Sequence, residues 1–354
     1  MHQKPSMADI VVLTGGTGYL GSRILKDLLK RDYKVRLTTR SVEKTNAIDW
    51  ITELKMEFSG QLSIHYGDLM DAESFIKVME GARYVIHSAS PFKIEGVKNA
   101  KSELIEPAVK GTQNVLDAVD RSTSVEKVVL TSSLAAIYGD AKDMELIDSD
   151  KFNENHWNIS SSISHQPYSY SKVAAEKAAW KCNEGKTWKL ITINPGFILG
   201  PTISNRNDST SIKFIIDMVN GKFKMGVPDL YFSVVDVRDV SIAHIKALES
   251  DNANGRYICT NKTLHVLDIS KGLKKVVGHK FNKFPSRKLP KWLTYLVAPF
   301  LTGFTWAYLN KNLGVFFDFE NTKIKNELGI YFRDFNETLL DHVEQLEEDG
   351  IVKM

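Results

Sequence analysis

The chain has 354 residues, of which 43% are hydrophobic and 25% charged, a composition that excludes a largely disordered protein. Its 46 Lys and Arg residues nearly balance 43 Asp and Glu, and without a dense Lys/Arg block the net charge of +3 indicates no nucleic-acid partner. Cys182 and Cys259 lack metal-ligand spacing, and residues 1–9 lack the apolar core of a signal peptide, so we expect no metal site and a cytoplasmic location.

A glycine-rich turn follows the first predicted strand, residues 10–13, and leads into a predicted helix over residues 22–30. Such a turn places a pyrophosphate at a helix N-terminus: Gly15 allows the sharp turn, Gly18 the approach of the phosphates, and Gly21 close packing of the helix. The stride is G-x-x-G-x-x-G, wider than the common G-x-G-x-x-G. The pattern predicts a dinucleotide site, with a plain glycine-rich connection as the alternative.

Short β-branched runs then alternate with longer amphipathic stretches. The predicted strands are residues 33–38, 62–66, 83–87, 127–130 and 190–194, and one predicted helix runs from about residue 104 to 119. This alternation is typical of βαβ units around a parallel sheet that is covered on both faces. The sequence therefore predicts an α/β protein with a Rossmann-type doubly wound sheet.

The end of the second predicted strand indicates which nicotinamide cofactor is bound. NAD-binding proteins carry an acidic residue about twenty positions after the glycines, where it holds the ribose 2′-hydroxyl. This chain has Arg40 there, followed by Lys44. Two cations suit the 2′-phosphate of NADP, and Arg40 can also stack on adenine. We expect NADP(H); the alternative is that both cations only solvate a loop.

Two serines, Ser132 and Ser133, follow the strand at residues 127–130. Ligands of open α/β sheets bind at the carboxyl ends of the strands, and a hydroxyl there can hydrogen-bond a substrate carbonyl oxygen. A helix cap is the alternative role, and the spacing alone does not choose between the two serines.

Tyr168 and Lys172 lie four residues apart at the start of an alanine-rich predicted helix, so they share one face, whereas Tyr170 does not. An ammonium beside a phenol favours the phenolate and lowers its pKa from about 10. Lys172 is therefore expected to tune Tyr168 as a proton donor and to bind ribose. A Tyr-x-x-x-Lys spacing also arises by chance.

The second half of the chain is richer in loop-forming residues. We expect residues 1–195 to form the NADP-binding Rossmann domain, and residues 196–231 and 260–354 to form a smaller substrate-binding region. Two later runs, residues 232–237 and 256–259, are predicted to rejoin the main sheet as strands.

The segment 292–309 contains no charged residue and is just long enough to be considered as a membrane span. Three threonines dilute its hydrophobicity, and Pro299 and Gly303 interrupt it. We expect an aromatic-rich buried helix or a cover over the pocket. A membrane-surface or inserted segment is the alternative.

The ordered set of glycine turn, strand-end serines and Tyr-x-x-x-Lys resembles the extended short-chain dehydrogenase/reductase family. More narrowly, it resembles the branch of dihydroflavonol reductases, cinnamoyl-CoA reductases and yeast-type aldehyde/ketone reductases. The segments that carry this resemblance extend over most of the chain: residues 14–21, 87–92, 107–112, 129–133, 153–157 and 175–180.

The resemblance implies roles for individual residues. Ser133 would orient the carbonyl, Tyr168 would be the general acid and Lys172 its tuner. Pro195 would close over the nicotinamide, and the pair Asp68-Leu69 would contact adenine. The cofactor-binding set implied by the motifs and the resemblance is Gly15, Thr17, Gly18, Tyr19, Leu20, Gly21, Arg40, Lys44, Asp68, Leu69, Ala89, Tyr168, Lys172 and Pro195.

The substrate pocket is expected to be apolar, with Phe92, Ile94, Tyr138 and Phe197 as its candidate residues, and to suit an aldehyde or ketone of moderate size. Tyr138 stands where dihydroflavonol reductases carry Asn and cinnamoyl-CoA reductases carry Tyr. The residues before Tyr168 lack the Asn-Trp of the cinnamoyl-CoA reductases, so neither substrate class is assigned.

The predicted function is NADPH-dependent reduction of an aldehyde or ketone to an alcohol. The expected partner is the small-molecule carbonyl substrate, and the expected oligomeric state is a monomer or homodimer. One alternative is an NAD-dependent sugar-nucleotide epimerase or sterol dehydrogenase of the same extended family. The other is a non-catalytic NADP sensor or scaffold.

Overall fold

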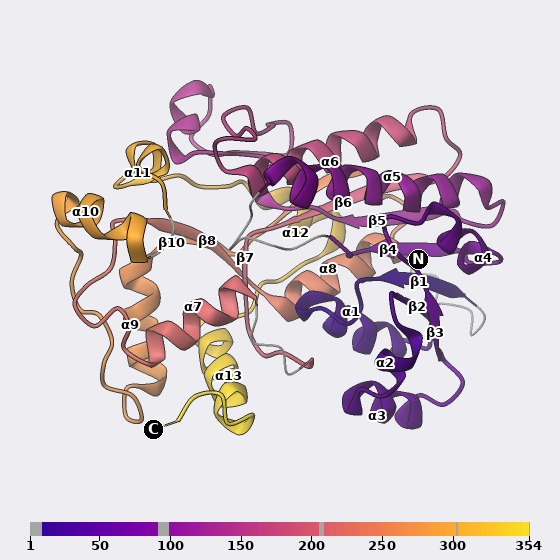
Figure 1. Ribbon diagram of the computed structural model, residues 1–354, viewed down its shortest axis with the longest axis horizontal. Helices are drawn as coiled ribbons and strands as arrows, with labels where there is room; N and C mark the ends of the chain where they lie inside the picture. The colour runs from indigo at the N-terminus through magenta and orange to yellow at the C-terminus, as the bar shows by residue number, and fades with distance from the viewer. Residues whose placement is uncertain (1–8, 91–98, 205–208, 302–303, 354) are drawn as a thin grey trace.

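The computed structural model describes residues 9–90, 99–204, 209–301 and 304–353. Seven parallel strands form the main sheet in the order β3-β2-β1-β4-β5-β6-β9 (Figure 1). Their bounds are β1 Ile10–Thr14, β2 Lys34–Thr39, β3 Leu62–Tyr66, β4 Tyr84–His87, β5 Lys127–Thr131, β6 Lys189–Pro195 and β9 Gly255–Cys259. The predicted Rossmann-type doubly wound sheet is confirmed.

Helices cover both faces of this sheet because each has one apolar stripe. On one face, α1 (Tyr19–Leu29) and α8 (Val237–Glu249) bury aliphatic side chains in a common core with the strands. On the other face, α5 (Glu106–Arg121) and α6 (Pro167–Asn183) pack against each other and against the sheet (Figure 1). The shorter helices near this sheet are α2 Val42–Asn46, α3 Asp49–Glu57, α4 Ile76–Met79 and α12 Thr322–Leu328.

A second, three-stranded sheet in the order β10-β8-β7 builds the rest of the molecule. Its strands are β7 Phe197–Leu199, β8 Tyr231–Asp236 and β10 Lys262–His265. Its apolar side chains pack with α7 (Thr210–Val219), α9 (Val266–Val277) and α13 (Phe335–Glu348) in a separate core. Short 3₁₀ turns span Ala72–Phe75, Leu134–Ala136 and Ala141–Leu146, and a π-helical turn spans Lys101–Ile105.

One of the two late strands does not lie where the sequence predicted. The run 256–259 joins the main sheet beside β6 as expected, but the run 232–237 lies in the second sheet, where it pairs with β7 and β10. β8 pairs in parallel with β7, which begins two residues after β6 ends, and Gly196 between them permits close packing, since a Cβ there would lie 2.3 Å from the Ser233 carbonyl oxygen. The domain division at residue 195 stays a prediction.

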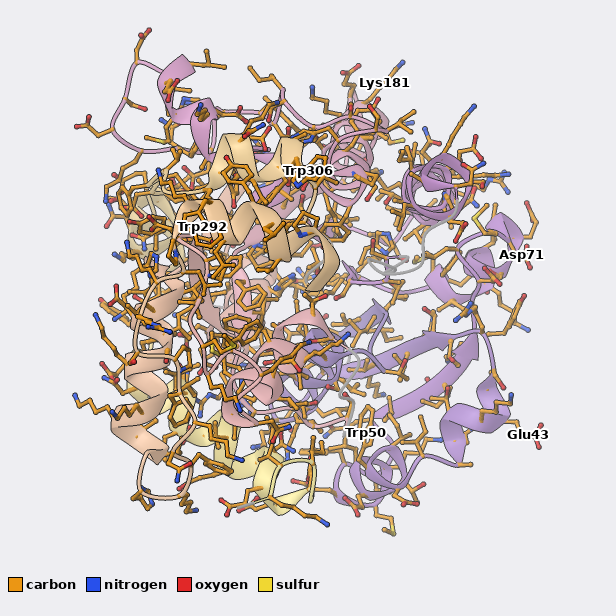
Figure 2. All side chains as sticks on the ribbon, turned by 60° about the vertical axis from the view of Figure 1, so that its left-hand side comes forward. Glu43, Trp50, Asp71, Lys181, Trp292 and Trp306 are labelled. Carbon is orange, nitrogen blue, oxygen red and sulfur yellow. The ribbon has the colours of Figure 1, made fainter. Side chains whose placement is uncertain are left out.

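The apolar segment 292–309 forms two short helices, α10 (Lys291–Leu301) and α11 (Trp306–Asn312). No helix within the described residues is long and apolar enough to cross a membrane. The expectation of a buried aromatic helix is wrong for its largest side chains, since Trp292 and Trp306 are 69% and 62% exposed. On α10 the small residues Thr294 and Ala298 are buried instead, which leaves Trp292 outward, and Trp306 is exposed at the start of α11 (Figure 2).

Three buried histidines make the stability of this fold sensitive to acid. Burial lowers the pKa of His87 to about 3 and those of His244 and His342 to about 4. Each is neutral in the folded chain, whereas in the unfolded chain it takes up a proton below about pH 6.5. The free energy of unfolding therefore falls as the pH drops from about 6.5 towards 4, by up to about 1.4 kcal/mol per pH unit for each histidine.

We expect His244→Gln to be less stable than the wild type at pH 7 but to lose less stability on acidification. Urea denaturation at several pH values between 7 and 4.5 measures both quantities. An unchanged pH dependence in the variant would contradict the assignment of a neutral buried His244.

Candidate active site

A cavity of about 980 Å³ lies along the carboxyl ends of the main-sheet strands and extends to the second sheet. It brings together every predicted site residue that the structure describes. These lining residues are Gly15, Thr17, Gly18, Tyr19, Leu20, Gly21, Arg40, Lys44, Asp68, Leu69, Ala89, Ser133, Tyr138, Tyr168, Lys172, Pro195 and Phe197. Phe92 and Ile94 lie outside the described residues.

The glycine turn has the backbone geometry of a phosphate cradle. Gly15 has φ +73°, and a Cβ on it would lie 2.6 Å from the Ala89 nitrogen. A Cβ on Gly21 would lie 2.1 Å from the Gly15 carbonyl oxygen. Gly18 directly precedes α1. Among the described residues, a Cβ on Gly18 would meet only that same oxygen, at 3.3 Å, and no side chain there caps the helix. The N-terminus of α1 therefore faces the cavity and fits a pyrophosphate.

The far edge of the cavity is basic. Arg40 and Lys44 both line it and both are exposed to solvent. The turn after β2 is held by a hydrogen bond between the Thr39 and Thr45 hydroxyls at 2.8 Å, and the Ser41 Oγ accepts from the backbone nitrogen of Lys44. This edge fits a phosphate on the adenosine ribose.

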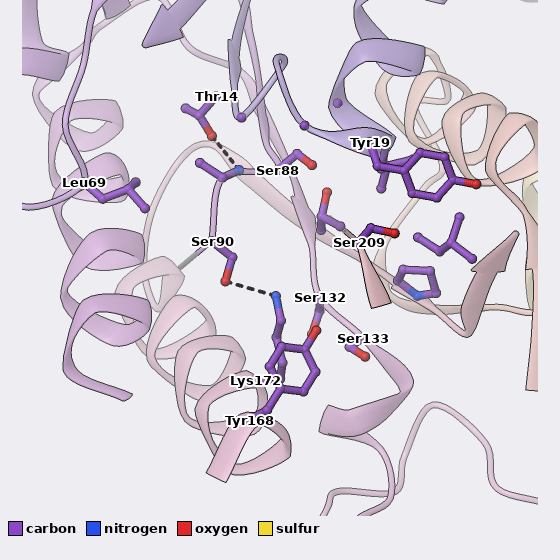
Figure 3. Close-up of a pocket in the computed structure, with 18 of the residues that line it drawn as sticks. Thr14, Tyr19, Leu69, Ser88, Ser90, Ser132, Ser133, Tyr168, Lys172 and Ser209 are labelled. Atoms are coloured by element: carbon purple, nitrogen blue, oxygen red, sulfur yellow. Dashed lines mark hydrogen bonds between the residues drawn. The ribbon is translucent and has the colours of Figure 1, made fainter. Parts of the chain in front are cut away.

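Tyr168 lies in the first turn of α6 and Lys172 one turn later, on the same face as predicted (Figure 3). The Lys172 Nζ donates a hydrogen bond to the Ser90 Oγ at 3.1 Å, and it lies 5.7 Å from the centre of the Tyr168 ring. Ser90 was missed by the sequence analysis, although it lies in a segment that carried the family resemblance.

The pKa values of this pair differ from the prediction. Burial raises the pKa of Tyr168 to about 12. Burial also lowers the pKa of Lys172 to about 8, and the charge of Glu176 opposes this lowering. The expectation that Lys172 lowers the pKa of Tyr168 is therefore wrong for this structure. The ammonium lies over the ring and bonds Ser90, so burial of the phenol dominates. Tyr168 consequently holds its proton at neutral pH.

The two strand-end serines have different partners. Ser132 is buried and donates its hydroxyl proton to the Glu176 carboxylate. Ser133 is more accessible, and its Oγ accepts a hydrogen bond from the Ala135 nitrogen at 3.1 Å, which caps a 3₁₀ turn. Because this contact uses the oxygen as an acceptor, the Ser133 hydroxyl can still donate its proton into the cavity.

Glu176 is the centre of a buried network that the sequence analysis missed. Its side chain accepts from the Arg256 Nε at 2.6 Å and from the Asn194 Nδ2 at 2.8 Å. Asn194 also donates to the Ser133 carbonyl oxygen at 3.1 Å. The network thus holds the backbone of Ser133. Its sequence signal was the position of Glu176, four residues after Lys172 and on the same side of the helix.

A second buried carboxylate, Asp140, holds the residues that precede Tyr168. Gln166 has a left-handed backbone (φ +54°), and its Nε2 donates to Asp140 at 2.7 Å. The His165 Nε2 at 2.8 Å and the Asn312 Nδ2 at 2.8 Å bind the same carboxylate. Burial opposes ionisation of Asp140, but the hydrogen bonds from Asn312, His165 and Lys311 keep its pKa below the usual value. The strained Gln166 is thereby fixed at the start of α6.

Part of the cavity wall is aromatic. Phe197 and Phe232 stack with their ring centres 5.0 Å apart. Tyr138 lines the cavity, but its ring packs against Phe317 and Phe319, so it is largely part of a core cluster. In the described part of the chain, α10 and α11 contribute no lining residue, which contradicts the predicted pocket cover.

A Rossmann sheet with this glycine turn and a Tyr-x-x-x-Lys pair at one cavity defines a nucleotide-dependent protein of the short-chain dehydrogenase/reductase type. The chain matches the NAD dependent epimerase/dehydratase family over residues 11–259, more than half of its length. The chain therefore belongs to this family.

Its relatives include plant and yeast oxidoreductases. The chain is 32% identical over 289 residues to cinnamoyl-CoA reductase CAD2 of Medicago truncatula, which covers 81% of this chain and 84% of the relative. It is 35% identical over 277 residues to an uncharacterized oxidoreductase of Saccharomyces cerevisiae, which covers 72% and 78%.

Solved structures give the same result. Yeast methylglyoxal/isovaleraldehyde reductase Gre2 complexed with NADPH matches with a TM-score of 0.74 at 26% identity, over 97% of this chain and 100% of that one. Vestitone reductase from alfalfa matches with a TM-score of 0.73 at 26% identity, over 97% and 99%. The predicted resemblance to this branch of reductases is confirmed.

The different partners of the two serines lead to a prediction. We expect Ser133→Ala to lower kcat by about 10²- to 10³-fold, as loss of an oxyanion-stabilising donor does, with little change in thermal stability. Ser132→Ala should instead lower the melting temperature, because it removes a hydrogen bond to a buried carboxylate. Steady-state kinetics and thermal denaturation of both variants test this. If kcat fell more in Ser132→Ala than in Ser133→Ala, Ser132 and not Ser133 would be the donor to the substrate oxygen.

Proposed function

We propose that this chain reduces the carbonyl group of an aldehyde or ketone to an alcohol with NADPH. The proposal rests mainly on one observation: a single cavity is lined by the glycine turn, by Arg40 at its basic edge, and by Ser133, Tyr168 and Lys172. The names of the relatives, which include cinnamoyl-CoA, methylglyoxal/isovaleraldehyde and vestitone reductases, support the same chemistry.

The residues of the chain have distinct parts in this reaction. NADPH supplies the hydride when bound, and Gly15 to Gly21, Arg40 and Lys44 would hold its phosphates. Ser133 donates a hydrogen bond to the substrate oxygen and Tyr168 transfers its phenolic proton to that oxygen. Lys172, held by Ser90, binds the ribose and keeps Tyr168 in place. The aromatic end of the cavity excludes water from the reacting carbon.

The alternatives have less support. An NAD-dependent epimerase or sterol dehydrogenase has no use for two cations at the end of β2, and a sensor has no use for a buried proton donor. A cytoplasmic location and a monomeric or homodimeric state remain part of the proposal. The substrate is a small molecule in every version of it.

The role of Tyr168 is tested by Tyr168→Phe. This variant should lower kcat by about 10²- to 10⁴-fold, because it removes the general acid, while the Kd for NADPH changes little. Tyr170→Phe on the same helix is the matched control and should keep full activity. Rates followed by NADPH absorbance with a panel of aldehydes and ketones would also show the preferred substrates. Substantial turnover by Tyr168→Phe would assign the proton to another donor.

The cofactor preference is tested by Arg40→Ala. Loss of a charge-assisted contact to the 2′-phosphate should weaken NADPH binding by about 10- to 100-fold and leave NADH binding nearly unchanged. Lys34→Ala, an exposed lysine at the opposite end of β2, is the control. Binding titrations with both cofactors give the result. Equal losses for NADPH and NADH would show that Arg40 does not bind the phosphate.

A further inference from the structure

An exposed apolar surface lies at the end of the molecule that α10 and α11 form. Trp292 and Leu296 are four residues apart on α10 and are 69% and 61% exposed. Trp306, at the start of α11, is 62% exposed, and its indole N–H donates to the Tyr295 carbonyl oxygen at 3.1 Å. We call Trp292, Leu296 and Trp306 the tryptophan face. Figure 2 shows both tryptophans on the same side of the molecule.

The chain around this face is strongly basic. Residues 269–317 contain no Asp or Glu, and their nine Lys and Arg residues contribute a charge of +9, so the other residues together carry −6. These cations are Lys271, Lys274, Lys275, Lys280, Lys283, Arg287, Lys288, Lys291 and Lys311. The near-neutral charge of the whole protein therefore hides one basic segment of sequence and an acidic remainder.

Some of these cations are neutralised and others are not. Lys271, Lys280, Lys288 and Lys311 pair with acids outside the segment. Among the described residues, no ion pair joins Lys283, Arg287 or Lys291 to an acid, and all three are exposed. Lys291 directly precedes Trp292. Arg287 donates to the carbonyl oxygen of Met225, whose side chain is 67% exposed. Unneutralised charge and exposed apolar side chains thus lie next to each other.

We propose that the tryptophan face docks on the surface of an anionic lipid bilayer. Tryptophan side chains prefer the headgroup level of a bilayer, where the ring is in apolar surroundings and the N–H can reach water or a polar group. Exposed lysines and arginines beside them are attracted to anionic headgroups. α10 has 11 residues and α11 has 7, against the roughly 20 that a membrane-spanning helix needs, so the contact we propose is with the bilayer surface.

A second copy of the chain is a poorer occupant of this face. A two-fold contact places the same surface of each copy opposite the other, so the cations of one copy would oppose those of the partner. Like charges across such a contact repel, whereas an anionic bilayer offers the opposite charge over the whole face. The proposal does not depend on the reaction, because no residue of the tryptophan face lines the active-site cavity.

Vesicle co-sedimentation of the full chain tests the proposal. We expect the protein to bind phosphatidylcholine vesicles that contain phosphatidylserine, to bind pure phosphatidylcholine much more weakly, and to be released by salt. The double variant Trp292→Ala/Trp306→Ala should lower the partition coefficient by about tenfold or more. Arg287→Gln/Lys291→Gln should lower it by a similar factor, on the anionic vesicles only. Tyr331→Ala, which removes a 90% exposed aromatic elsewhere, should bind like the wild type.

Reductase activity with a water-soluble aldehyde and the melting temperature serve as folding controls and should be unchanged in the charge variant. Equal binding to neutral and anionic vesicles would overturn the proposal. So would wild-type binding by both double variants. If the tryptophan variant instead converted a dimer to a monomer with no effect on vesicle binding, the face would be a contact between copies and the proposal would also fail.

Discussion

The arrangement of the active site depends on one buried carboxylate, that of Glu176. It is 1% exposed and binds Ser132, Asn194 and Arg256, which belong to the ends of three neighbouring strands or follow them directly. Removing one partner of a buried ion pair typically costs about 3–5 kcal/mol, because the remaining charge is left without compensation. Since Glu176 lies on the helix that carries Tyr168, the same contacts fix Tyr168, the proton donor we propose, relative to these strands.

The cavity has two ends with different physical properties. At one end, the N-terminus of α1 and the exposed Arg40 favour negative charge, and the glycines leave room for it. Elsewhere in the cavity, Phe197 and Phe232 form an apolar wall, and the half-buried Tyr168 lines the same cavity. A dinucleotide carries charged phosphates in one part and a flat nicotinamide in another, so it matches the charged and apolar parts of the cavity in only one orientation. The polarity of the cavity thus orients the cofactor before any contact to a substrate is made.

Much of the fold and site could be predicted from sequence because the relevant signals are local. The glycine stride, the strand-end serines and the four-residue spacing of Tyr168 and Lys172 each lie within one turn or one helix. The failures concern long-range packing. The sheet that β8 joins depends on its pairing with β7 and β10, and the pKa of Tyr168 depends on burial by distant segments. The orientation of Trp292 likewise depended on which face of α10 packs inward.

The way β9 and α8 return to the main sheet has a consequence for dividing the protein. The first 195 residues contain the glycine turn and α6, yet they lack the edge strand that supplies Arg256 and the helix that covers α1. Asn312, from near the other end of the chain, binds the carboxylate that holds Gln166. The unit built on the main sheet is therefore continuous in space but interrupted in sequence. Exchanging the second sheet and its helices between relatives requires two separate grafts, with residues 237–259 retained between them.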